Sequence, residues 1–155
     1  MALQATQATA RANSNSNKAL KLEAVQCDLI SALLPRMEHT VDVLIFNPPY
    51  VPTPDDEVCG SGIEASWAGG TNGRRVIDRA IPQIARVLSK PHGVGYVITV
   101  DDNQPEQLSQ VFYGMGIHMQ PLLRRRANNE YLSVQKLTWR KGDDSDSRPD
   151  KEVSS

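Results

Sequence analysis

The stretch from Val41 to Tyr50 constrains the fold more than any other part of the chain. Its first six residues, through Phe46, are rich in β-branched and apolar side chains and too few for a stable helix. Because polar residues do not alternate with them, we expect a strand covered on both faces, as in a parallel sheet. The two prolines that follow cannot donate ladder hydrogen bonds, so the strand should end at Asn47. Open α/β sheets bind their ligands at this carboxyl end.

Asn47-Pro48-Pro49-Tyr50 has the chemistry of a clamp for a planar NH₂ group. The Asn47 side-chain oxygen can accept one N–H and the Pro48 carbonyl the other, and neither proline has an N–H to compete. The Tyr50 ring offers a face on which an amide or a nucleobase can stack. Since the lone pair of such a nitrogen is delocalised, fixing its hydrogens and its plane aims it at an electrophile. We call these three groups the clamp, and expect it to act by orientation without a general base.

The composition is that of a globular protein, with 155 residues, 39% hydrophobic and 23% charged residues, and a formal net charge of −1. This charge gives no electrostatic case for nucleic-acid binding by the whole chain. The two cysteines have no zinc or disulfide spacing, which favours a reducing cytoplasmic or nuclear location. No apolar run approaches the roughly 20 residues of a membrane span, and no secretory signal is visible, so we expect no membrane association.

The rest of the chain predicts an alternation of helices and strands. We expect an alanine-rich helix ending near Arg11, and a later helix capped by Asn72 and bent at Pro82. The other predicted elements are a strand over Leu20–Cys27, a turn over Ser31–Met37 stopped by Pro35, a strand over Val94–Val100, a helix over Pro105–Tyr113, and a strand pair over Ile117–Leu123 and Tyr131–Trp139. We assign residues 1–18 to a partial helix and flexible start, 19–141 to the main domain, and 142–155 to a disordered acidic tail.

A long irregular loop, from Thr53 to Thr71, follows the clamp directly. A loop of this length inside a compact domain is usually functional or disordered, so it is a candidate cover for a substrate. Trp67 in this loop is a candidate substrate contact, although one tryptophan is as often a packing anchor. No His or Cys spacing points to a metal site.

Several of these blocks, taken together, resemble one methyltransferase family. They are Asn47–Tyr50 after a hydrophobic strand, Glu64-Ala65-Ser66-Trp67-Ala68-Gly69-Gly70, Asn72-Gly73-Arg74 and Glu130-Tyr131-Leu132. The likeness, which runs from about Leu3 to Lys141, is to the HemK-like class I S-adenosylmethionine-dependent methyltransferases, and within them to the eukaryotic and archaeal release-factor glutamine methyltransferases.

The resemblance implies a Rossmann-like α/β fold with a mostly parallel sheet and a terminal antiparallel strand pair. It implies methyl transfer from S-adenosylmethionine to the glutamine amide in the Gly-Gly-Gln loop of a translation termination factor, with Asn47, Pro48, Pro49 and Tyr50 as catalytic residues. It further implies that Asp28, Leu29 and Asn47 contact the cofactor, and that Asn47, Tyr50 and Trp67 contact the substrate. A small zinc-binding activator subunit would form a heterodimer with the chain at the Leu20–Cys27 edge.

The sequence departs from the family pattern at its beginning. The Gly-rich turn after the first strand and the acidic residue after the second, which hold the cofactor in the family, have no counterpart among these 155 residues. We therefore expect a truncated form that lacks the first strand-helix-strand portion, binds S-adenosylmethionine poorly by itself and is inactive alone. Measurable methyl transfer by the purified chain would overturn this expectation.

Two classes of function remain open from the sequence. The first is an enzyme that methylates a glutamine amide or, alternatively, a DNA adenine or a histone lysine. The second is a non-catalytic protein that keeps the activator-binding edge or the clamp. Arg124-Arg125-Arg126 also permits nucleic-acid binding, although a solvated turn between strands is the simpler interpretation.

Overall fold

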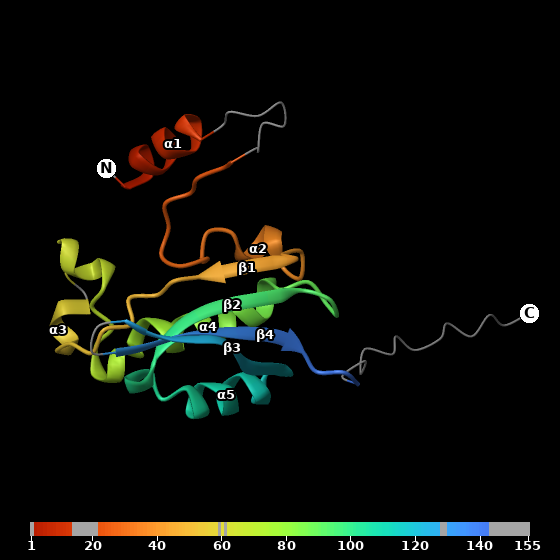
Figure 1. The fold of residues 1–155 in the computed structure, drawn as a ribbon. Coiled ribbons are helices and arrows are strands. Elements are labelled where there is room, and N and C mark those ends of the chain that lie inside the picture. Colours follow the sequence, from red (N-terminus) through yellow and green to blue (C-terminus); the bar gives the residue numbers. More distant parts are fainter. Residues whose placement is uncertain (1, 14–21, 59, 61, 128–129, 143–155) are drawn as a thin grey trace, which may run out of the picture. The chain divides into compact units, whose positions relative to one another are not determined.

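The computed structural model describes residues 2–13, 22–58, 60, 62–127 and 130–142, which fall into two compact units divided after Ala32 (Figure 1). The described part of the first unit contains the helix α1 (Ala2–Ala12), which confirms the helix predicted there. The predicted strand over Leu20–Cys27 is wrong for the part that is described, because residues 22–26 form no strand. A segment becomes a strand only when its backbone pairs with that of another strand, and none of the described strands pairs with these residues.

The second unit is built on a four-stranded sheet in the order β1-β2-β4-β3 (Figure 1). Its strands are β1 (Val43–Phe46), β2 (Val94–Val100), β3 (Ile117–Ala127) and β4 (Glu130–Trp139). β1 and β2 are parallel, whereas β4 is antiparallel to both β2 and β3. This mixed sheet confirms the predicted α/β class with a terminal antiparallel pair.

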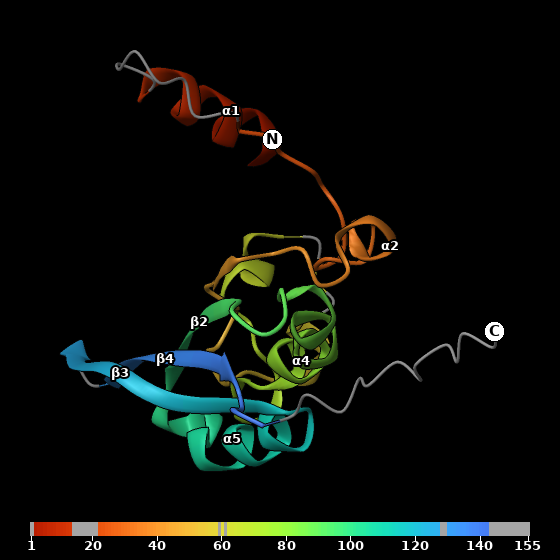
Figure 2. The ribbon, with the colours of Figure 1, turned by 90° about the vertical axis from the view of Figure 1, so that its right-hand side faces the viewer.

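Two helices cover one face of this sheet (Figure 2). They are α4 (Arg75–Val87), which contains Pro82, and α5 (Pro105–Gly114). Their apolar residues recur at helical spacing and meet alternate residues of the strands, because successive strand side chains point to opposite faces. The buried core includes Ile77, Ile81, Ile84, Leu108, Phe112, Val97, Ile117 and Leu137.

The opposite face of β1 is open, which corrects the prediction that this strand is covered on both sides. The side chains of Val43 and Ile45 are 62% and 80% exposed, while Leu44 and Phe46 are half-buried. The β-branched run still forms a strand because it pairs with β2. Its pattern lacks polar residues on the exposed side, so the sequence could not reveal which face is bare.

Shorter elements differ from prediction in their details. Pro35 lies at the first turn of the short helix α2 (Leu34–Met37), where its missing N–H costs nothing, and does not stop it. The loop after the clamp contains α3 (Asp55–Val58) and the 3₁₀ turns η1 (Ile63–Ser66) and η2 (Thr71–Gly73). α4 is preceded by Arg74 and not by the predicted cap Asn72.

The strand pair β3–β4 is longer than predicted. Arg124, Arg125 and Arg126 belong to β3, where they pair with Ser133, Leu132 and Tyr131, so their assignment to a polar turn was wrong. The acidic tail after Gly142 lies outside the described residues. No helix in the described ranges is long and apolar enough to cross a membrane.

Candidate functional site

The candidate site forms where the parallel strands β1 and β2 end side by side. β1 ends at Phe46, which is in register with Val97 of β2, so Asn47 continues beside Ile98. β2 ends at Val100 and leads into the 3₁₀ turn η3 (Asp101–Asn103). Since both chain segments leave the sheet at the same edge, the loop after β2 can support the loop after β1.

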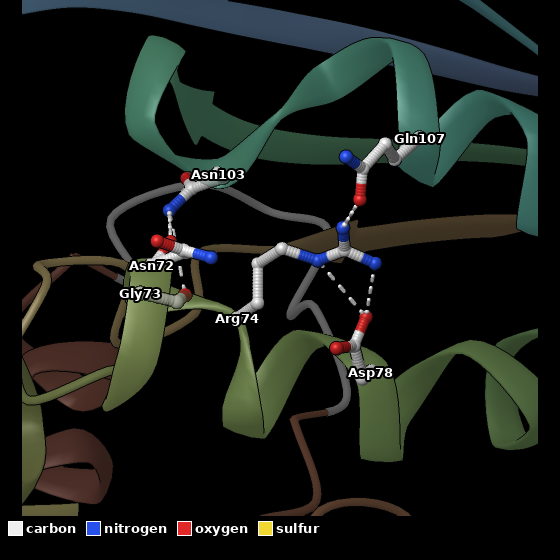
Figure 3. Close-up of polar contacts among 6 residues, drawn as sticks. All are labelled: Asn72, Gly73, Arg74, Asp78, Asn103 and Gln107. Carbon is white, nitrogen blue, oxygen red and sulfur yellow. Dashed lines mark hydrogen bonds and ion pairs between the residues drawn. The ribbon is translucent and has the colours of Figure 1, made fainter. Parts of the chain in front are cut away.

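Asn103 provides that support, and its side chain is fully buried. Figure 3 shows this side chain directed toward Asn72 and Gly73. Its Nδ2 donates hydrogen bonds to the carbonyl oxygens of Tyr50 and Asn72, both at 2.9 Å, and of Gly73 at 3.4 Å. Its Oδ1 accepts a hydrogen bond from the backbone N–H of Val100 at 2.8 Å. A buried amide is stable only when its donors and acceptor are used, and here they tie three loops together at the clamp.

The segment after the clamp is also held by the far end of the loop. The N–H of Val51 donates to Trp67 O at 3.0 Å, and the N–H of Gly69 donates to Val51 O at 2.8 Å. A Cβ on Gly69 would lie 2.6 Å from the carbonyl oxygen of Pro49. A Cβ on Gly73, whose φ is +65°, would overlap the carbonyl oxygen of Tyr50. The two glycines therefore permit a close backbone approach that no other residue allows.

Arg74 fixes the start of α4 to α5 (Figure 3). Its Nε and Nη2 donate to Asp78 Oδ1 at 3.2 and 2.9 Å, and its Nη1 donates to Gln107 Oε1 at 2.8 Å. The residue immediately after Gly73 is thus anchored to both helices. These contacts hold the turn that contains Gly73, whose backbone lies against the carbonyl group of Tyr50.

Asp55, near the start of the loop that follows the clamp, is bonded to Thr71 at the end of that loop. Its Oδ1 accepts hydrogen bonds from the Thr71 N–H at 2.9 Å and from the Thr71 hydroxyl at 3.2 Å, and Arg75 forms an ion pair at 3.4 Å. The backbone bond from Thr71 is the main cause of a lowered pKa for Asp55, and the Thr71 hydroxyl and Arg75 lower it further. These contacts favour the charged carboxylate in the folded chain.

We expect the stability that Asp55 contributes to disappear on acidification. Because its pKa is lower when folded, this contribution is fully present well above the ordinary value of 3.8 and is lost as pH falls through the folded value. Urea unfolding of the wild type and of Asp55→Asn at several pH values measures the effect. The difference in unfolding free energy should shrink as the pH falls, and an unchanged difference down to about pH 3 would contradict it.

The polar groups of the clamp are available for a ligand. Asn47 is exposed, and within the described part of the chain its carboxamide makes no hydrogen bond. The Pro48 carbonyl accepts none from any described donor either, although Pro48 is buried. Tyr50 is half-buried with its backbone fixed by Asn103. The motif therefore combines a rigid backbone with unused acceptors, as a preorganised binding site requires.

A cavity of about 460 Å³ opens beside the clamp. It is lined by Asn47, Tyr50, Ile98, Leu123, Arg125, Leu132, Ser133 and Val134. A mostly apolar wall with a few polar groups is typical of a binding pocket, and the volume suits a side chain or a small ligand. Asn47 and Tyr50 are thus brought together as predicted.

The other predicted site residues are placed differently. Trp67 does not line this cavity; it is 41% exposed and its backbone oxygen bonds Val51. Asp28 and Leu29 belong to the first unit, where Leu29 has a left-handed φ of 53° and the Cys27 thiol donates to its carbonyl at 3.1 Å. Among the described residues, no group of three or more His, Cys, Asp or Glu could hold a metal ion.

Sequence reasoning missed three residues of the site: Asn103, Gly73 and Arg125. Asn103 could have been found, because it follows the second parallel strand at the same sheet edge as Asn47.

A larger cavity, of about 770 Å³, lies at the opposite end of β2, lined by Val94 and by Trp139 among others. We place the candidate site at the smaller of these two cavities because Asn47 and Tyr50 of the clamp line it.

No protein-family model matches the chain, but curated relatives do. It is 45% identical over 130 residues to the human methyltransferase HEMK2, covering 84% of this chain and 58% of that protein. It is 36% identical over 104 residues to the eRF1 methyltransferase catalytic subunit mtq2 of Schizosaccharomyces pombe, covering 66% of this chain and 45% of that protein. The chain therefore spans about half the length of these relatives.

A solved structure is similar in fold. It is the Mtq2–Trm112 complex of E. cuniculi, described as responsible for methylation of the eRF1 translation termination factor. The TM-score is 0.60 at 28% sequence identity, and the match covers 75% of this chain and 60% of that one.

Proposed function

Because this chain belongs to the HemK-like class I methyltransferase family, we propose that its clamp holds the acceptor amide in a methyl-transfer reaction. The proposed acceptor is the glutamine side chain in the Gly-Gly-Gln loop of a translation termination factor. The names of the fission yeast relative and of the solved complex, both of which refer to eRF1, support this substrate. The observation that carries the proposal is a pair of unused acceptors, Asn47 Oδ1 and Pro48 O, at the end of a parallel strand.

The clamp would act by binding and orientation. Asn47 Oδ1 and the Pro48 carbonyl accept the two N–H groups of the amide, and the Tyr50 ring covers its plane. This geometry selects a flat NH₂ and rejects a carboxylate, which has no hydrogen to donate. The amide nitrogen is then directed out of its plane toward the electrophile, and its surplus proton leaves to water. No residue of altered pKa is needed for these steps.

S-adenosylmethionine, when bound, would supply a methyl group made electrophilic by its sulfonium sulfur, and the sulfur would leave as a neutral thioether when the S–CH₃ bond breaks. In our proposal Asp28 and Leu29 would hold its adenine end. Asp28 is exposed, and a carboxylate can accept a hydrogen bond from the adenine amino group, so this residue fits the role. The 155 residues contain no Gly-rich turn for the methionine end, so they fit only part of the cofactor.

We further propose that a small activator subunit of the Trm112 kind binds this chain. The complex in the similar solved structure supports such a partner. Residues 22–26 belong to no strand of the described sheet, and in our proposal this segment is where a strand of the activator would add. A zinc site would belong to that subunit.

The proposal is tested by comparing two peptides that differ only in the acceptor. A fluorescent peptide containing Gly-Gly-Gln should bind the chain about tenfold more tightly than its Gly-Gly-Glu counterpart, since only the amide donates hydrogen bonds. Anisotropy titrations measure both affinities. In Asn47→Ala the preference should fall to nearly none.

Three results would contradict the proposal: two from the peptide comparison and one from a titration with an adenine oligonucleotide. Equal binding of the two peptides would show that no NH₂ group is read. An unchanged preference in Asn47→Ala would place the recognition elsewhere. Binding of an unpaired adenine oligonucleotide in place of the peptide, again dependent on Asn47, would favour a nucleic-acid acceptor.

A further inference from the structure

The three consecutive arginines of β3 have different environments. Arg124 donates to Asp101 Oδ2 at 2.7 Å, and its guanidinium lies 4.5 Å from the centre of the Tyr131 ring. Arg126 shares its side of the strand, because side chains two residues apart point the same way. Arg125 points to the other side and lines the cavity that contains Asn47 and Tyr50.

Arg125 is the cationic side chain of this cavity. Within the described residues it makes no hydrogen bond and no ion pair. It is exposed, whereas the neighbouring Arg124 is already neutralised by Asp101. A guanidinium with five N–H donors is therefore directed at the space beside the clamp with nothing in the described structure to bind.

Strand register places an apolar floor between the clamp and Arg125. Asn47 continues beside Ile98, Ile98 pairs with Val134, and Val134 pairs with Leu123, which is 58% exposed. The backbone of β1 is three strand spacings of about 4.8 Å from that of β3, or about 14 Å. Extended peptide rises about 3.3 Å per residue, so roughly two to four residues span the gap, part of which the arginine side chain fills.

We propose that Arg125 selects the protein substrate by binding an acidic side chain roughly two to four residues away from the acceptor glutamine. This inference rests on the proposed function, since it places the glutamine amide in the clamp. The floor of Ile98, Val134 and Leu123 favours a peptide, whose apolar groups it can bury, over a phosphate backbone. The formal net charge of −1 likewise gives nucleic acid no general attraction.

Peptide pairs test this selection. Each pair contains Gly-Gly-Gln and either Asp or Asn at one position two to four residues before or after the glutamine, and affinities are measured by fluorescence anisotropy. For at least one position the wild type should bind the Asp peptide about three- to fivefold more tightly, which is the range expected for an exposed ion pair. Arg125→Gln should remove the preference, and Arg125→Glu should reverse it toward a Lys peptide.

Arg126→Gln is the matched control, because it removes the same charge one residue along β3 on the opposite side. It should keep the preference for the acidic peptide. Equal unfolding midpoints for both glutamine variants, measured in urea, show that neither result comes from misfolding.

The inference is overturned if the wild type binds no peptide, if it binds Asp and Asn peptides equally, or if Arg125→Gln keeps the preference. Arg125-dependent binding of single-stranded DNA without peptide binding would overturn it in favour of nucleic acid. Its failure is separable from that of the proposed function. A lost Gln-over-Glu preference concerns the clamp, whereas a lost Asp-over-Asn preference concerns Arg125 alone.

Discussion

Replacing Gly73 by alanine should destabilise the chain by about 3 kcal/mol or more. The new Cβ would overlap the carbonyl oxygen of Tyr50, and the φ of +65° already disfavours any L side chain. Relief requires moving either the clamp backbone or the turn that Asn103 and Arg74 hold. Urea unfolding followed by circular dichroism measures the loss, and peptide binding should weaken with it.

Gly114→Ala provides the matched control. Gly114 ends α5, and a Cβ there would meet nothing within 4 Å. Alanine has the higher helix propensity, so this variant should be neutral or more stable by a few tenths of a kcal/mol, up to about 1 kcal/mol. Equal effects of the two substitutions would show that the contact between Gly73 and the clamp does not limit stability.

Replacing Asn103 by alanine should cost about 2–4 kcal/mol. The substitution leaves the buried Val100 N–H and the part-buried carbonyl oxygens of Tyr50 and Asn72 without their partner. Asn103→Asp should be no better, because a carboxylate would face these carbonyl oxygens. Unfolding free energies of the three proteins give the result.

Asn47→Ala is the control for this prediction, because it removes the same chemical group from the other asparagine of the site. Asn47 is exposed and its carboxamide has no partner in the described structure, so stability should change by less than about 0.5 kcal/mol. The two variants thus separate a residue that holds the site together from one that is free to bind a ligand. A loss of stability in Asn47→Ala as large as in Asn103→Ala would contradict this assignment.

The sequence was informative where one physical rule dominates. The apolar run before Asn47 and the two prolines predicted a strand end, and the spacing of Ile77, Ile81 and Ile84 predicted a helix with one buried face. These patterns depend on residues that are close together in the sequence, so they can be recognised without knowledge of the tertiary structure. The strand-end rule then placed Asn47 and Tyr50 at a cavity.

Features that depend on long-range packing could not be predicted. The exposed face of Ile45 depends on what covers β1, and the role of Asn103 depends on two loops remote in sequence that meet at Tyr50. Asn72 looked like a helix cap, but its positive φ and its contact with Asn103 place it in the preceding turn. Arg125 looked like a turn residue because β3 continues through polar positions.

The decisive measurement is an NMR titration of the chain with a Gly-Gly-Gln peptide whose glutamine side-chain amide carries ¹⁵N. If the clamp accepts both hydrogens, both N–H resonances should shift on binding and exchange more slowly with water, and neither should do so with Asn47→Ala. A peptide that binds while its side-chain amide resonances stay at their free positions would show that the Asn47–Tyr50 segment does not hold the acceptor.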